Sequence, residues 1–146
     1  MSTQVLFITP PFTQLNTPYP ATAYLKGFLN TLGASSKQAD LGIEVMLAIL
    51  SKPGLIRIFE QAEKSTSLSD NSLRILRLRA QYLQTIGPVI DFLQDKNPTL
   101  AYSIAEGEFL PQAGRFEQVE ELDWAFGALG IRDKARYLAT LYLEDL

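Results

Sequence analysis

The first fifty residues alternate between two kinds of hydrophobic pattern. Gln4–Thr9 is a short run of β-branched and aromatic residues with apolar positions in succession, which is typical of a strand buried on both faces of a parallel sheet. Residues 22–32 carry apolar side chains at three- and four-residue spacing, which predicts a helix that ends at Gly33. A second short strand is expected over residues 36–39 and a second helix over residues 41–50. The predicted order is strand, helix, strand, helix.

From Pro53 onward the pattern is helical throughout. The helices are expected over residues 53–63, 69–85, 89–94, 98–105, 117–126 and 133–146. Gly87 and Pro88 are expected to break or kink the chain between the second and the third of these helices, and residues 109–115 are expected to form a loop. The predicted fold class is therefore a helix-rich α/β protein, with a β-α-β-α segment over residues 1–52 followed by a helical segment over residues 53–146.

Two short strands cannot form a parallel sheet that is covered on both faces, so the predicted sheet is unfinished. The last segment, residues 134–146, is strongly helix-periodic and stops without a glycine, a proline or a basic cap. These features predict that the chain is a piece of a longer protein. The alternative is a complete domain that ends in a helix.

Composition excludes several kinds of chemistry. The chain has no cysteine and no histidine, which excludes thiolate nucleophiles, cysteine-bound clusters, histidine triads and HExxH metal sites. A net charge of −3 argues against nucleic acid as a partner. No stretch reaches the roughly 18 to 20 apolar residues of a membrane helix, no signal peptide is evident, and the lack of cysteine fits a cytoplasmic protein.

The densest candidate for ligand binding is the segment PPFTQLNTPYPAT, residues 10–22, between a buried strand and a helix. In open α/β sheets, ligands bind outside the carboxyl ends of the strands. Proline fixes the backbone of such a loop, so its side chains bind with little loss of conformational entropy. The candidate contact residues of this loop are Pro10, Pro11, Asn16, Thr17 and Tyr19. The alternative is that the prolines only stiffen a long connection.

Asp40 ends the second predicted strand at the same edge of the sheet. Its carboxylate could accept a hydrogen bond from a ligand hydroxyl, and it is the sixth candidate residue for cofactor binding. Capping of the following helix is the favoured role, because aspartate is a common N-cap residue.

Two charged stretches and one aromatic pair carry weaker signals. Residues 106–123 hold six acidic residues and one basic residue, and Glu117, Glu120 and Glu121 are expected on one solvated helical face rather than in a catalytic pair. Arg74, Arg77 and Arg79 form a basic stretch, in which Arg74 is expected to pair with Asp70. Trp124 and Phe126 are expected to anchor the helical core, and Gly127–Gly130 fits a helix-ending turn better than a phosphate loop.

Two segments resemble a known family. PPFTQLNTPYPATAYLKGF at residues 10–28, followed by QADLGIE at residues 38–44, is similar to the N-terminus of radical S-adenosylmethionine proteins that carry a cobalamin-binding-type domain before their catalytic barrel. Residues 123–146 resemble a helical segment that intervenes in one subgroup before the sheet resumes. Together these segments cover about half of the chain.

The resemblance implies a Rossmann-like segment that is not catalytic by itself and that faces the cofactor of a parent enzyme. Cobalamin would bind at the residues 10–20 loop and at Asp40, without an axial histidine. The iron–sulfur cluster and S-adenosylmethionine would belong to the parent, because its CxxxCxxC motif is absent here. The expected partners are the remainder of the parent chain and, through the unfinished sheet, a second copy. The alternatives are a stand-alone helical interaction module and, least favoured, a carboxylate-based hydrolase.

Overall fold

A computed structural model of the protein describes residues 4–12, 20–119, 126–127 and 130–146. The chain divides into two compact units, Met1–Ile49 and Leu50–Leu146, called here the N-terminal unit and the helical unit. The boundary expected from the sequence was between residues 52 and 53. Each unit is described by itself.

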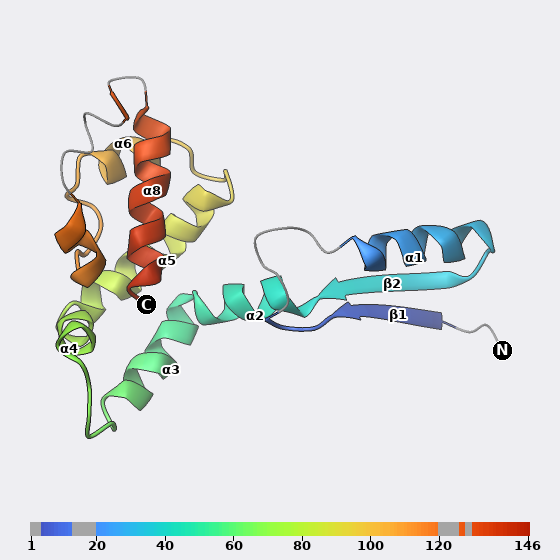
Figure 1. Cartoon of the computed structure of the whole chain (residues 1–146), viewed down its shortest axis with the longest axis horizontal. Helices are drawn as coiled ribbons and strands as arrows, with labels where there is room; N and C mark the ends of the chain where they lie inside the picture. Colours follow the sequence, from blue (N-terminus) through green and yellow to red (C-terminus); the bar gives the residue numbers. More distant parts are fainter. Residues whose placement is uncertain (1–3, 13–19, 120–125, 128–129) are drawn as a thin grey trace. The chain divides into compact units, whose positions relative to one another are not determined.

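The N-terminal unit has the predicted order of strands and helices (Figure 1). It consists of β1 (Gln4–Thr9), α1 (Ala21–Thr31), β2 (Ser35–Asp40) and α2 (Leu41–Ile49). The two strands are parallel, with Gln4 opposite Ser35 and Thr9 opposite Asp40. The prediction of a helix-rich α/β protein that begins with β-α-β-α is confirmed for the described residues.

Gly33 ends α1 in the way the sequence predicts. Its φ is +71°, a conformation in which L side chains are strained. The Gly33 N–H donates to the carbonyl oxygen of Asn30 at 3.1 Å, and the Ala34 N–H donates to that of Leu29 at 3.0 Å. These are the two hydrogen bonds of a Schellman motif, and they turn the chain from α1 back into β2.

The prediction that β1 is buried on both faces is wrong. Val5, Phe7 and Thr9 are half-buried or buried, whereas Leu6 and Ile8 on the opposite face are 59% and 49% exposed. Ser36 lies opposite Val5 and donates from Oγ to Oδ1 of Asn30 in α1 at 3.3 Å. Because α1 lies over the face of Val5, the face that carries Leu6 and Ile8 is left open.

The helical unit contains α3 (Lys52–Ala62), α4 (Asp70–Arg77), α5 (Arg79–Leu93), α6 (Leu100–Ala105), the 3-10 helix η1 (Gly114–Gln118) and α8 (Ile131–Glu144) (Figure 1). Every buried hydrophobic side chain found in the described residues belongs to this unit. The largest fully buried side chains are Leu55, Tyr82, Ile86, Val89, Phe92, Ile104 and Tyr142.

Two helix starts are confirmed by their caps. Ser51 Oγ accepts a hydrogen bond from the Gly54 N–H at 3.1 Å, and Pro53 lies in the first turn of α3. Ser69 Oγ accepts from the Ser72 N–H at 3.1 Å at the start of α4. Serine is favoured at these positions because its side chain satisfies one of the free N–H groups of the first turn.

The interruption expected at Gly87 and Pro88 lies at Leu78 instead, between α4 and α5. Helix α5 runs through Pro88 to Leu93. Its buried stripe consists of Tyr82, Thr85, Ile86, Val89 and Phe92, on both sides of the proline. Packing of this stripe holds the helix together although Pro88 has no N–H to donate.

The prediction of a helix over residues 117–126 is wrong for the first residues of that range. Residues Gly114–Gln118 form a 3-10 turn, and Val119 is extended with a ψ of 91°. Two N–H groups at the start of this turn, those of Gly114 and Arg115, donate to side chains from other parts of the fold, Asn71 and Asp145. Tertiary hydrogen bonds therefore override the local helical pattern, and residues 120–125 lie outside the described part.

The final helix α8 packs as its periodicity predicts. Leu138 and Tyr142 are buried and Leu141 is half-buried. The Tyr142 ring stacks on that of Tyr82 with centroids 5.0 Å apart, and its hydroxyl lies 3.0 Å from Oγ1 of Thr85. These contacts join α8 to α5 in the core.

Of the two expected aromatic anchors, Trp124 lies outside the described residues. Phe126 is half-buried and packs against Tyr137, with ring centroids 5.8 Å apart. Tyr137 is 41% exposed, so this pair lies at the edge of the core rather than inside it. Gly127 follows Phe126 with a φ of +59°, as a helix-ending turn requires.

Candidate functional site

A hollow of about 630 Å³ opens in the N-terminal unit where β2 ends. It is lined by Pro20, Thr22, Ala23, Tyr24, Gln38, Ala39, Asp40 and Ile43. Thr9 and Asp40 face each other in the register, so the carboxyl ends of both strands lie at this edge. This is the edge at which open α/β sheets bind ligands.

Asp40 lines the hollow and also caps α2. Its Oδ1 accepts hydrogen bonds from the N–H groups of Gly42 at 3.0 Å and Ile43 at 3.2 Å. The predicted capping role is confirmed. Contact of the carboxylate with a ligand remains a prediction, and the cap would hold the carboxylate in place for it.

The remaining candidate residues are not gathered at the hollow in the described part. Pro10 follows β1 and Pro11 lies in a turn; both are exposed, and neither lines the hollow. Asn16, Thr17 and Tyr19 lie outside the described residues. Sequence analysis missed Thr22 and Gln38, which supply polar side chains to the wall. Their signal was position: Gln38 lies two residues before Asp40 and therefore on the same face of β2.

Phe12 has an unusual backbone beside the proline pair. Its φ is +62°, and its ring is 75% exposed. A positive φ is rare for a bulky residue and costs energy that the surrounding structure must offset. Such residues cluster at ligand sites and switch segments, and Phe12 lies within the proline-rich segment of residues 10–22 that is expected to bind a ligand.

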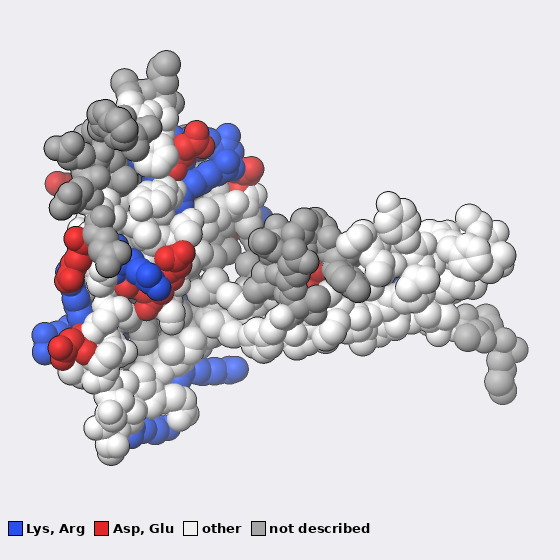
Figure 2. All heavy atoms as spheres, in the orientation of Figure 1, with Lys and Arg blue, Asp and Glu red and all other residues white. Residues whose placement is uncertain are grey.

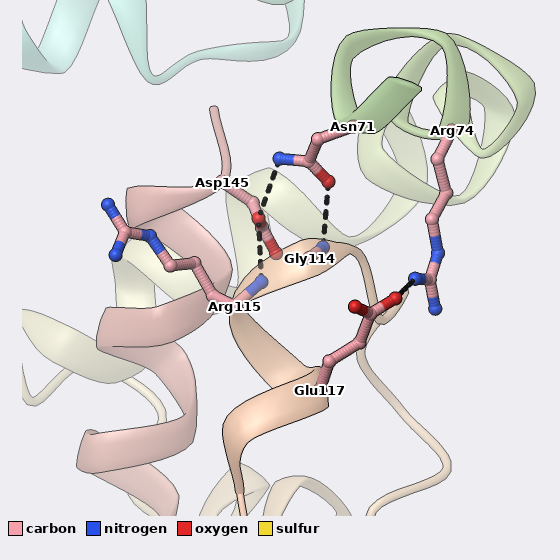
Figure 3. Close-up of polar contacts among 6 residues, drawn as sticks. All are labelled: Asn71, Arg74, Gly114, Arg115, Glu117 and Asp145. Atoms are coloured by element: carbon pink, nitrogen blue, oxygen red, sulfur yellow. Dashed lines mark hydrogen bonds and ion pairs between the residues drawn. The ribbon is translucent and has the colours of Figure 1, made fainter. Parts of the chain in front are cut away.

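A second polar cluster lies in the helical unit, where segments far apart in the sequence meet (Figure 3). Asn71 in α4 accepts at Oδ1 from the Gly114 N–H at 2.8 Å and donates from Nδ2 to Asp145 at 3.3 Å. The same Oδ1 of Asp145 accepts from the Arg115 N–H at 3.1 Å. Asp145 is only 7% exposed. The cluster ties α4, η1 and the end of α8 together.

Charged residues of the helical unit form surface pairs. Glu117 forms an ion pair with Arg74 (Figure 3), so the prediction that Arg74 pairs with Asp70 is wrong. Glu117 is 67% exposed, which agrees with a solvated carboxylate, although it lies in η1 and not on a helical face. Glu120 and Glu121 lie outside the described residues. Arg79 pairs with Glu63.

Asp95 is held by two arginines. Its Oδ1 accepts from Arg132 at 2.6 Å and from Arg136 at 3.0 Å. The hydrogen bond from Arg132, followed by the positive charges of both arginines, holds the pKa of Asp95 below its ordinary value. All three side chains are about half exposed, so this is a surface clamp between the end of α5 and α8.

The described residues hold no group of three or more acidic side chains placed to bind a metal ion. Within that same part of the chain, no helix has the length and apolar character needed to cross a membrane. In comparisons with known proteins, neither a family, nor a curated protein, nor a solved structure matches this chain.

Proposed function

We propose that the chain is the N-terminal, non-catalytic module of a cytoplasmic radical S-adenosylmethionine enzyme of the cobalamin-binding type. The observation that supports this best is the hollow at the carboxyl ends of β1 and β2, beside a proline-rich connection. The hollow lies where a Rossmann-like sheet would bind a cofactor. The resemblance of residues 10–28 and 38–44 supplies the identity of that cofactor as cobalamin.

The wall of the hollow suits a large ligand with a polar rim. Tyr24 and Ile43 are 78% and 52% exposed and offer apolar surface, while Thr22, Gln38 and Asp40 offer hydrogen-bonding groups. Largely apolar pockets with a few fixed polar groups are typical of cofactor sites. The chain has no histidine, so cobalamin bound here would receive no imidazole ligand from these residues.

The partner in this proposal is the remainder of the parent chain. β1 contains no charged residue, whereas β2 carries Lys37, and lysine is typical of strands at the edge of a sheet. Further strands are therefore expected beside β1, with β2 outermost. Figure 2 supports an interface: charged side chains gather on the helical unit, while the visible face of the N-terminal unit is almost free of them.

A titration with hydroxocobalamin, followed by absorbance, tests the site. The isolated chain is expected to bind weakly or not at all, because only two strands contribute loops to the pocket. Tyr102→Ala, at an exposed position of α6, is the matched control for Tyr19→Ala combined with Asn16→Ala. Micromolar binding that the double variant leaves unchanged would refute the placement of the ligand at this loop.

The sequence of the gene beyond codon 146 tests the identity. The proposal expects further strand-and-helix segments and a CxxxCxxC motif for the iron–sulfur cluster. A stop codon at position 147 would refute it. That result would favour the interaction module, which the core of the helical unit already supports, since that core is formed by residues 55–142 alone.

A further inference from the structure

A small pocket in the helical unit is independent of the proposed cofactor site. It has a volume of about 130 Å³ and lies between α3, α4 and the end of α8. Phe59 and Ala62 of α3 and Ile75 and Leu76 of α4 form apolar walls. Asp145 is the single ionisable side chain in the wall.

Asp145 has one carboxylate oxygen without a partner. Its Oδ1 accepts the two hydrogen bonds from Asn71 and Arg115 described above (Figure 3). Its Oδ2 is buried and accepts no hydrogen bond from the described residues. A buried carboxylate oxygen that lost its water on folding is costly unless a donor replaces the water.

The cations nearest in this part of the fold are paired elsewhere. Arg74 pairs with Glu117, and Arg115 Nε lies 3.8 Å from Glu144. No described lysine or arginine forms an ion pair with Asp145. The Tyr82 hydroxyl is also buried without a partner and forms no hydrogen bond with Asp145. Oδ2 therefore has no donor among the described residues, and a donor from outside them can occupy it.

The size and lining of the pocket indicate the class of donor. Its volume is about four times the roughly 30 Å³ that one water occupies in the liquid. Besides Asp145, Ser72 has the one hydrogen-bonding side chain in the wall, and the other side chains of the wall are apolar. A primary ammonium is compact and carries three donors, and a short alkyl chain would fill the apolar remainder. We infer that this pocket binds a small primary alkylammonium, with the ammonium on Asp145 and the alkyl chain between α3 and α4.

The probe is n-butylammonium chloride, titrated into the ¹⁵N-labelled chain, with the amide resonances of Gly114 and Arg115 as reporters. Saturable shifts in the millimolar range are expected, because the ligand has few atoms. 1-Butanol, which has the same chain without the charge, is expected to bind at least about tenfold more weakly, as the loss of a charged hydrogen bond implies. Neither comparison requires a variant.

Three variants locate the site. Asp145→Asn removes the charge and should weaken binding about tenfold or more. Ala62→Leu fills the pocket without touching the carboxylate and should abolish binding even if Asp145→Asn does not fold. Asp133→Asn, at an exposed position of α8, is the matched control and should bind as the unmodified chain does.

Three results would overturn the inference. No saturable shift up to about 50 mM n-butylammonium, far above the dissociation constants of typical weak ligands, would mean that Asp145 is satisfied by a structural water only. Equal affinity for 1-butanol and n-butylammonium would show that the Asp145 carboxylate does not contribute to binding. Unchanged binding by Ala62→Leu would place the ligand outside this pocket. None of these results bears on cobalamin, because the two sites lie in different units.

Discussion

Replacement of Gly114 by alanine tests the polar cluster that joins α4, η1 and α8. A Cβ at this position would lie 2.7 Å from Oδ1 and 2.9 Å from Cγ of Asn71. Contacts this short force the amide to move. Because Asn71 accepts from the Gly114 N–H at 2.8 Å and donates to Asp145 at 3.3 Å, movement breaks both hydrogen bonds.

The expected loss follows from these two contacts. Each hydrogen bond contributes about 1 kcal/mol, and loss of the bond from Asn71 leaves Asp145 less satisfied in a buried position. Overpacking adds about 1 to 3 kcal/mol. Gly114→Ala should therefore lower the free energy of unfolding by about 3 to 5 kcal/mol. For a unit of about 100 residues, this lowers the melting temperature by at least about 12 °C.

Urea denaturation followed by far-UV circular dichroism measures the effect. The control is Gly87→Ala in α5, where a Cβ would meet nothing within 4 Å. Alanine is the better helix former, although Pro88 restricts the residue before it, so the control should change stability by between zero and a gain of about 1 kcal/mol. A Gly114→Ala variant as stable as the control would refute the role assigned to the cluster.

Three further predictions concern the core tyrosines, the ion pair of Arg74 with Glu117, and the open face of β1. Burial raises the pKa of Tyr142 to about 12, and burial together with the negative charge of Asp145 raises the pKa of Tyr82. Because both tyrosines ionise near pH 10 in the unfolded chain, their contribution to stability is complete below pH 10 and falls above it. Tyr142→Phe should therefore reduce the difference between the urea midpoints measured at pH 9 and at pH 11. Glu117→Gln breaks an exposed ion pair and should change thermal stability by less than about 1 kcal/mol; a larger loss would contradict the solvated assignment. The isolated chain should self-associate at micromolar concentration in light scattering, and Leu6→Lys should reduce this association where Tyr102→Lys does not; a monomeric unmodified chain would contradict the argument from the open face of β1.

Local signals predicted much of the N-terminal unit. The strand Gln4–Thr9 is six residues of consecutive strand formers, Gly33 supplies the positive φ of a helix end, and Asp40 caps the next helix. Each of these depends on residues within a few positions along the chain. Local chemistry therefore determines them, and no tertiary contact overrides it.

The errors in the helical unit have tertiary causes. Pro88 lies inside α5 because buried side chains on both sides of it pack into one core. The turn at Gly114 forms because Asn71, 43 residues earlier, and Asp145, 30 residues after Arg115, accept its N–H groups. Neither partner could be identified from the pattern near the turn. The pocket at Asp145 was missed for the same reason.

The candidate site was predicted only as far as the strand ends. Asp40 was identified because it ends β2. Gln38 and Thr22 could be identified only once it was known which face of β2 is covered by α1. The position of α1 also determines which face of β1 is open. Val5 and Ser36 lie on the same side of the sheet, and α1 covers that side. If further strands join the sheet beside β1, a crossover helix on the open face would cover Leu6 and Ile8.

Completion of the sheet and binding at the hollow are therefore coupled in the proposed function. The N-terminal unit contributes no buried hydrophobic side chain among the described residues, and α2 exposes Ile43 and Leu47 although Glu44 is its one charged residue. A helix with so few polar positions is typically buried. In the proposed function, the added strand-and-helix segments that would cover these side chains also bring the loops that would complete the hollow. A ligand that binds the completed hollow more tightly must, by thermodynamic linkage, stabilise the added strands by the same free energy.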